Sequence, residues 1–330
     1  MFDVQNLYVI PLDQWIQDGV RWLALHFRPL FQTIKWPVET LLNAINGLLH
    51  LIPFPILSVL FALVAWRVAS RGVGIFTLLS FVFIAFIGLW SDAMTTLSLI
   101  ATAIVICVII GIPFGVLCAR SDRTWAVVRP ILDVMQTTPS FVYLVPVVML
   151  FGVGTIAGGV AVIVAAVPPL IRFTNLGIRM VDAEMVEAGR AFGATDRQLL
   201  WEVQLPLAMP TILGGLNQTV LTAMVMSVIV AMIGAEGLGL VVLQGLGRLD
   251  VGMAAVGGIA IVLLAMVLDR MTQGLARQDK AAVGGSLRAT LSRLLRPIAP
   301  SRTLPHPAHR PDNPVLSPKR PAASPEEETV

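Results

Sequence analysis

The chain has 330 residues, of which 56% are hydrophobic and 13% are charged, and its formal net charge is +3. Soluble globular proteins carry about 25% charged residues, so this composition excludes an ordinary soluble domain and indicates an integral membrane protein. The two cysteines, Cys107 and Cys118, share one apolar run and lack metal-ligand or redox spacing. We therefore expect buried thiols, no disulfide framework and no metal site.

The first segment, residues 1–52, mixes aromatic residues and leucines with Asp13, Asp18, Arg21 and Arg28. It lacks a basic n-region followed by an apolar core, so we expect the N-terminus to be retained. Near-helical spacing predicts amphipathic helices along the outer, periplasmic membrane surface. The alternative is a further, poorly hydrophobic span, in which each of these charges would be costly at the bilayer centre.

Apolar runs long enough to cross the bilayer follow, since a hydrocarbon layer of about 30 Å requires about 17 to 25 helical residues. Residues 53–90 are expected to form the first two transmembrane helices. Pro139 and Pro146 interrupt the fourth run, and Pro168 and Pro169 end the fifth. The sequence thus predicts an all-α membrane protein with about seven spans, at 53–69, 74–90, 93–118, 131–152, 154–171, 210–233 and 251–268.

Basic residues mark one side of the predicted membrane protein. They follow the first, third, fifth and seventh spans, and the loops around Ser91 and 152–159 have none. Only Arg248 departs from this pattern. Because basic loops stay in the cytoplasm, we expect a periplasmic N-terminus and a cytoplasmic C-terminus in a bacterial inner membrane. The basic residues are Arg67, Arg71, Arg120, Arg123, Arg129, Arg172, Arg179, Arg190, Arg197, Arg270 and Arg277.

The C-terminal segment, residues 274–330, becomes rich in Pro, Arg and Ser. Such a composition cannot bury a core, so we expect a disordered cytoplasmic tail. The tail is either solvated or bound to anionic lipid headgroups.

A polar stretch at 182–206 interrupts the apolar half of the chain. Met185, Ala188 and Phe192 are three and four residues apart, which predicts a helix with an apolar seam, and Gly193 stands at its expected left-handed cap. Thr195 and Gln198 have the spacing of a capping box.

This capping box should start a second helix, with Leu199, Leu200 and Val203 facing inward, that stops before Pro206. The resulting corner is either a loop packed on its own bundle or an element that docks into a groove of a partner.

The corner carries a specific resemblance. Its pattern is similar to the EAA motif of ABC-importer permeases. That motif reads E-A-A, then any three residues, G, any nine residues, I, any one residue, and L-P. The spacing is met throughout, with Gly for the third-position Ala and Val for Ile. The resemblance implies a cytoplasmic coupling helix that sits in a cleft of an ABC ATPase, formed by Glu187, Ala188, Gly189, Gly193, Val203, Leu205 and Pro206.

The flanking segments 129–154, 203–220 and 247–273 resemble permease subunits of ProU-type glycine betaine/proline betaine importers. The likeness runs from about Ile10 to Gln273 and implies a type I ABC-importer permease core at 91–273. It also implies a homodimer, a cytoplasmic ATPase that binds ATP and magnesium, and a periplasmic substrate-binding protein. Choline and carnitine importers share this permease type and remain alternatives.

Two observations fit this reading without the resemblance. The chain has no G-x-x-x-x-G-K-[ST] loop, so it is expected to be a transporter subunit and not an ATPase. The inner spans show no acidic residue, His or Lys at mid-membrane depth, which disfavours an ion-coupled secondary carrier. A scaffold protein is a further alternative. The expected contacts are these partners and membrane lipid, with no nucleic acid.

Polar and aromatic residues of the interrupted fourth run and of the sixth run are candidates for the substrate pathway. Interrupted helices often border transport sites, although Thr, Asn and Gln also hydrogen-bond between membrane helices. Glu236, beyond the sixth run, is a candidate for the outer gate or for contact with the binding protein, or is an exposed loop carboxylate. The pathway candidates are Gln136, Thr137, Thr138, Phe141, Tyr143, Asn217, Gln218 and Thr219.

Overall fold

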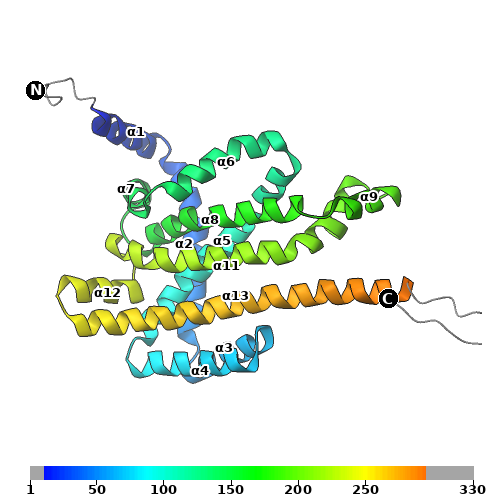
Figure 1. The fold of residues 1–330 in the computed structure, drawn as a ribbon. Coiled ribbons are helices and arrows are strands. Elements are labelled where there is room, and N and C mark those ends of the chain that lie inside the picture. The colour runs from blue at the N-terminus through cyan, green and yellow to red at the C-terminus, as the bar shows by residue number, and fades with distance from the viewer. Residues whose placement is uncertain (1–10, 295–330) are drawn as a thin grey trace, which may run out of the picture. The chain divides into compact units, whose positions relative to one another are not determined.

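The computed structural model describes residues 11–294, and every regular element in this part of the chain is helical (Figure 1). The elements are α1 (Leu12–His26), α2 (Arg28–Leu51), α3 (Phe54–Val68), α4 (Arg71–Phe86), α5 (Trp90–Arg120), α6 (Asp122–Thr137), α7 (Ser140–Phe151), α8 (Thr155–Arg179), α9 (Ala183–Ala191), α10 (Asp196–Gln198), η2 (Leu199–Gln204), α11 (Leu205–Ile229), η3 (Val230–Ile233), α12 (Leu238–Gly247) and α13 (Val251–Leu294).

The core is formed by α5, α8 and α11, which pack along one another. Glycines permit this close approach: a Cβ at Gly115 of α5 would lie 2.4 Å from the Cβ of Thr174 on α8. A Cβ at Gly215 of α11 would similarly lie 2.4 Å from the Cβ of Phe173. Membrane helices use such small residues because close backbone approach maximises packing.

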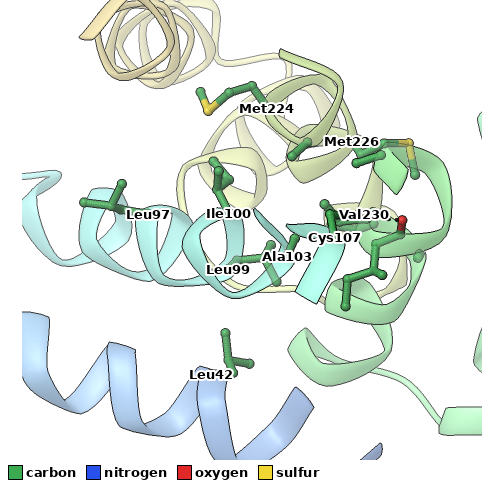
Figure 2. Close-up of a cluster of buried hydrophobic side chains, with 14 of the residues drawn as sticks. Leu42, Leu97, Leu99, Ile100, Ala103, Cys107, Met224, Met226 and Val230 are labelled. Atoms are coloured by element: carbon green, nitrogen blue, oxygen red, sulfur yellow. Dashed lines mark hydrogen bonds between the residues drawn. The ribbon is translucent and has the colours of Figure 1, made fainter. Parts of the chain in front are cut away.

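Figure 2 shows the centre of this core, where Leu99, Ile100 and Ala103 of α5 lie near Met226 of α11. Cys107 is fully buried here, and Cys118 is buried towards the end of α5. Both thiols are buried, as expected.

Four described helices are long and apolar enough to cross a membrane: α5, α8, the continuous stretch 196–233 and residues 251–276 of α13. Two further crossings would each need a bent pair, α2 with α3 at 110° or α6 with α7 at 102°. The described residues therefore offer four spans, or six if each bent pair counts as one, where the sequence predicted about seven.

The first two predicted spans are helical but short. Helices α3 and α4 have 15 and 16 residues, which at about 1.5 Å per residue gives about 22 to 24 Å, less than the hydrocarbon thickness. Helix α2 is more than a surface helix, because Val38 and Leu42 are buried and α2 packs against α5 and α8. Figure 2 shows Leu42 on the side facing α5.

The prolines act differently from the prediction. The fourth run breaks at Pro139, between α6 and α7, whereas Pro146 lies inside α7. Helix α8 continues past Pro168 and Pro169 to Arg179, although the sequence predicted an end there. Membrane helices tolerate such prolines because neighbouring helices and local adjustments satisfy the freed backbone groups.

The predicted tail begins later than expected, because residues 274–294 continue α13 as a helix. Leu, Ala and Arg are frequent there, and these are strong helix formers. The rest of the predicted tail, residues 295–330, lies outside the described residues.

Candidate functional site: a helical corner and a polar cavity

The corner predicted at 182–206 has the expected local structure. The Asp182 carboxylate accepts a hydrogen bond from the Glu184 N–H at the start of α9. Gly193 has a φ of +82°, and its N–H donates to the Arg190 carbonyl at 2.9 Å. A left-handed residue at this point ends the helix and is most accessible to glycine.

The second helix of the corner starts with the predicted capping box. The Gln198 N–H donates to the Thr195 hydroxyl, and the Thr195 N–H donates to the Gln198 side-chain oxygen at 3.0 Å. An ion pair between Arg190 and Asp196, at 3.9 Å, spans the turn. The corner is therefore held by local interactions of its own residues.

The second helix does not stop before Pro206, as the sequence predicted. It passes through the π-helical segment η2 into α11, and the Leu205 N–H donates to the Leu200 carbonyl, five residues back. A proline lacks an N–H and clashes with the preceding turn of an α-helix. The wider π turn just before Pro206 provides the local adjustment that lets the helix continue.

The apolar seam of α9 points away from the bundle. Phe192 is 93% exposed, and Met185 and Ala188 are also exposed. In contrast, Leu199 and Leu200 of the second helix are buried, as predicted. The corner is thus anchored through its second helix, while its first helix presents an uncovered apolar ridge, the arrangement expected of a docking element.

The remaining motif residues fall on both sides of the corner. Leu205 is buried, Val203 and Gly189 are partly buried, and Glu187 and Pro206 are exposed. Glu187 borders a hollow of about 620 Å³ whose lining also includes Arg120, Arg179 and Arg190. These basic residues were all predicted to lie on the cytoplasmic side, and here they gather at one end of the core.

Gly189, which departs from the motif, lies where the two helices of the corner meet. A Cβ at this position would lie 2.7 Å from Cδ1 of Leu199. The glycine lets α9 approach η2 closely, and the nearest atom is the end of a flexible side chain.

Part of the predicted pathway comes together in one cavity of about 490 Å³. Gln136 reaches it from the last turn of α6, Thr138 from the break after α6, Tyr143 from α7 and Gln218 from α11. The Tyr143 hydroxyl also donates to the Met135 carbonyl, which joins α7 to the end of α6.

Four other pathway candidates lie outside this lining. Phe141 is exposed, and the Thr137 hydroxyl donates to the Asp133 carbonyl at 2.9 Å within its own helix. Thr219 is fully buried and donates to the Gly215 carbonyl at 3.0 Å. Asn217 accepts a hydrogen bond from Thr272 of α13. Asn217 and Thr219 thus make hydrogen bonds to helix residues, which was the alternative to a role in the substrate pathway.

Three residues of this site, Arg172, Phe173 and Asp133, were not predicted from the sequence. Arg172 and Phe173 of α8 line the cavity, and Asp133 of α6 pairs with Arg172. Arg172 was assigned to a cytoplasmic loop because Pro168 and Pro169 were expected to end the helix. The signal that could have found the pair is a charge of each sign inside neighbouring apolar runs.

Glu236 lies at the other end of the core in a loop with a fixed backbone. The Glu236 backbone N–H donates to the Thr155 hydroxyl at 3.2 Å. The backbone N–H of Leu238 donates to the Thr96 hydroxyl at 2.8 Å. The Glu236 side chain is exposed. The loop thus connects the first turn of α8 with the second turn of α5, and the exposed Glu236 side chain lies on this hydrogen-bonded support.

The fold is that of a type I ABC-importer permease. Two structures of the MetNI methionine ABC transporter in inward-facing conformations superpose on this chain with TM-scores of 0.52 and 0.54. They are 23% identical to it and cover 56% and 58% of this chain and 92% and 95% of their own.

Sequence comparison defines the family more closely. Residues 111–278 match the family described as binding-protein-dependent transport system inner membrane component. The glycine betaine/proline betaine transport system permease protein ProW of Escherichia coli (strain K12) is 52% identical over 273 residues, 83% of this chain and 77% of ProW. The glycine betaine transport system permease protein OpuAB of Bacillus subtilis (strain 168) is 41% identical, over 82% of this chain and 96% of OpuAB.

The chain therefore belongs to the family of binding-protein-dependent transport permeases of the inner membrane. Members of this family are transport subunits, so the chain is not an enzyme, and a separate ATPase and a substrate-binding protein are its partners.

Proposed function

We propose that this chain is the membrane-spanning subunit of an ATP-driven importer of glycine betaine, proline betaine or related quaternary ammonium osmolytes. The observation that carries the proposal is the position of the corner, which joins α8 directly to α11. Both helices also line the polar cavity. A partner that moves the corner would therefore move two walls of the candidate pathway.

The length of the helices supports this coupling. Arg172 lies seven residues before the end of α8, or about 10 Å along the helix. Gln218 lies 22 residues after Asp196 in a helical stretch continuous to Ile233, or about 33 Å. Closure of an ATPase pair on the corner would move both helices, and alternating access would follow from their rigid-body motion.

The proposed assembly contains two copies of this chain, a partner ATPase and a binding protein. The partner ATPase would bind ATP and magnesium, because this sequence has no phosphate-binding loop. Glu187, Ala188, Gly189, Gly193, Val203, Leu205 and Pro206 would form the docking corner. Two copies of the chain would enclose the pathway, with the N-terminus in the periplasm, the C-terminus in the cytoplasm and Glu236 facing the binding protein.

The substrate class rests on the relatives. The name of ProW includes glycine betaine and proline betaine. The permease GbuB of Listeria monocytogenes is 40% identical over 84% of this chain and 99% of GbuB, and its name includes glycine betaine and carnitine. Carnitine and choline are therefore the competing substrates. A pathway that released its cargo quickly would need a few weak polar and aromatic contacts, which the cavity provides through Gln136, Tyr143 and Gln218.

The experiment is reconstitution of the full chain with its ATPase and binding protein in proteoliposomes. We expect uptake of radiolabelled glycine betaine that requires ATP and all three components, and weaker uptake of choline and carnitine. Uptake by the chain alone, driven by an ion gradient, would identify a secondary carrier. No uptake of any of the three compounds by the complete system would contradict the proposal.

A further inference from the structure

We infer that Arg172 binds the carboxylate of a zwitterionic substrate inside the polar cavity, which makes it a specificity-determining residue of the pathway. This inference rests on the proposed function, because the cargo is taken to be a small zwitterion with a carboxylate and a quaternary ammonium group.

Arg172 is the one charged residue that lines the cavity within the described part of the chain. The other polar lining groups are neutral amides and hydroxyls, such as those of Gln136 and Gln218. The acid that pairs with this cation, Asp133, lies outside the lining. An anionic group of a ligand in the cavity would therefore find its one cationic partner at Arg172.

Arg172 has hydrogen-bond donors that its partner Asp133 does not use. A guanidinium has five N–H donors in a planar fork that fits a carboxylate. The pair with Asp133 uses one terminal nitrogen, and Nε of Arg172 is buried with no hydrogen-bond partner among the described residues. The side chain as a whole is 32% exposed, so atoms other than Nε are open to a ligand.

Asp133 already places one carboxylate on Arg172. The Asp133 side chain is 49% exposed, and Arg129 approaches it to 4.0 Å on the same helix. A substrate carboxylate can therefore replace Asp133 on Arg172 while Asp133 keeps a basic neighbour. Exchange of one carboxylate for another changes the free energy little in either direction, as a pathway that must release its cargo requires.

The positive end of a betaine is a quaternary ammonium group. This group has no N–H and is held by aromatic faces through cation–π attraction. Tyr143 and Phe173 line the same cavity as Arg172. The cavity, at about 490 Å³, lies within the range usual for small-molecule sites, about 300 to 1,000 Å³. The lining thus combines a group for each charge of the zwitterion.

The test compares two variants that break the same ion pair. In the reconstituted complex, we expect Arg172→Gln to lower ATP-dependent glycine betaine uptake about tenfold or more, because a charge-assisted contact is lost. Asp133→Asn keeps the guanidinium and removes only the carboxylate that the substrate replaces, so its loss of uptake should be clearly smaller than that of Arg172→Gln. Arg172→Lys, which keeps the charge without the fork, should fall between them. Equal losses in Arg172→Gln and Asp133→Asn, or normal uptake by Arg172→Gln, would overturn the assignment.

A second measurement separates binding from the general effect of an osmolyte. The permease–ATPase complex, without binding protein, is heated with glycine betaine at high millimolar concentration, once as wild type and once as Arg172→Gln. Osmolytes stabilise folded proteins in general because they are excluded from the surface, so only the difference between the two proteins reports binding. We expect a larger rise of the unfolding temperature in wild type, and an equal rise in both would overturn the assignment. Absence of betaine uptake by the wild-type complex would instead contradict the proposed function itself.

Discussion

The corner can be weakened at a single position that touches no membrane span. Gly193 has a φ of +82°, and outside its immediate neighbours no atom of the described residues lies within 4 Å of the place a Cβ would take. Gly193→Val would therefore act through backbone strain and not through collision. A left-handed conformation costs an L-residue about 1 to 2 kcal/mol, and a β-branched residue is the least tolerant.

This strain sets the expected size of the effect. Because about 1.4 kcal/mol corresponds to a factor of ten, the ratio of native to non-native corner should fall about five- to thirtyfold. ATP-dependent uptake in proteoliposomes should fall by up to that factor, while the amount of chain in the membrane stays unchanged. Gly193→Asn should retain most activity, since Asn tolerates the left-handed region.

A matched control separates strain at the corner from strain in general. Gly88, after α4, has a φ of +78° and, like Gly193, open space at its Cβ position. Gly88→Val therefore introduces the same backbone strain far along the chain from the corner, and we expect near-normal uptake. Wild-type uptake by Gly193→Val, or an equal loss in Gly88→Val, would refute the coupling argument.

Four further predictions follow from individual contacts. Gly189→Ala should leave uptake within about twofold, because the Leu199 side chain can move aside. Gly189→Leu should overpack the corner, destabilise it by about 1 to 3 kcal/mol and strongly reduce uptake. Equal uptake by both variants would be inconsistent with a tight contact. Thr96→Val should destabilise the protein by about 1 to 3 kcal/mol in a denaturation assay, because the buried Leu238 N–H loses its acceptor, and Thr96→Ser should not. A double-mutant cycle of Asn217→Ala and Thr272→Val should give a coupling energy of about 0.6 kcal/mol for the contact between α11 and α13, and a zero value would remove Asn217 from this packing role. Glu236→Gln should lower uptake at low salt without changing substrate affinity of the binding protein, and high salt should reduce the difference; wild-type uptake at low salt would exclude a gate or docking role.

Local signals in the sequence were sufficient for the corner. The left-handed Gly193 and the capping box of Thr195 and Gln198 depend only on residues a few positions apart, so their chemistry is visible in the sequence. The path through Pro206 was predicted wrongly because a π turn has no comparable signature. The same lack of signature applies to Pro168 and Pro169, where tertiary packing decides whether the helix continues.

The cavity could be predicted only in part, because its walls come from helices that are distant in the sequence. Gln136 and Tyr143 were found through the broken run that contains them, and Gln218 through its polarity in an apolar run. Asn217 and Thr219 share that polarity, yet they bond to Thr272 and Gly215. Only the rotation of α11 against its neighbours separates Gln218 from these two residues, and a sequence pattern without a known packing partner does not fix that rotation.

Three departures from ordinary helix chemistry lie on one continuous path. Gly193 adopts a left-handed conformation, η2 is π-helical, and Arg172 lies inside an apolar helix, all between the cavity and the corner. The π turn and the arginine inside an apolar helix are locally unfavourable, and proteins retain such features mainly where function requires them. Because α8 and α11 carry the corner at one end and the cavity lining further along, strain introduced at Gly193 and charge removed at Arg172 should both impair transport. They should differ in ATP use: Gly193→Val should lower binding-protein-stimulated ATP hydrolysis together with uptake, whereas Arg172→Gln should lower uptake per ATP hydrolysed.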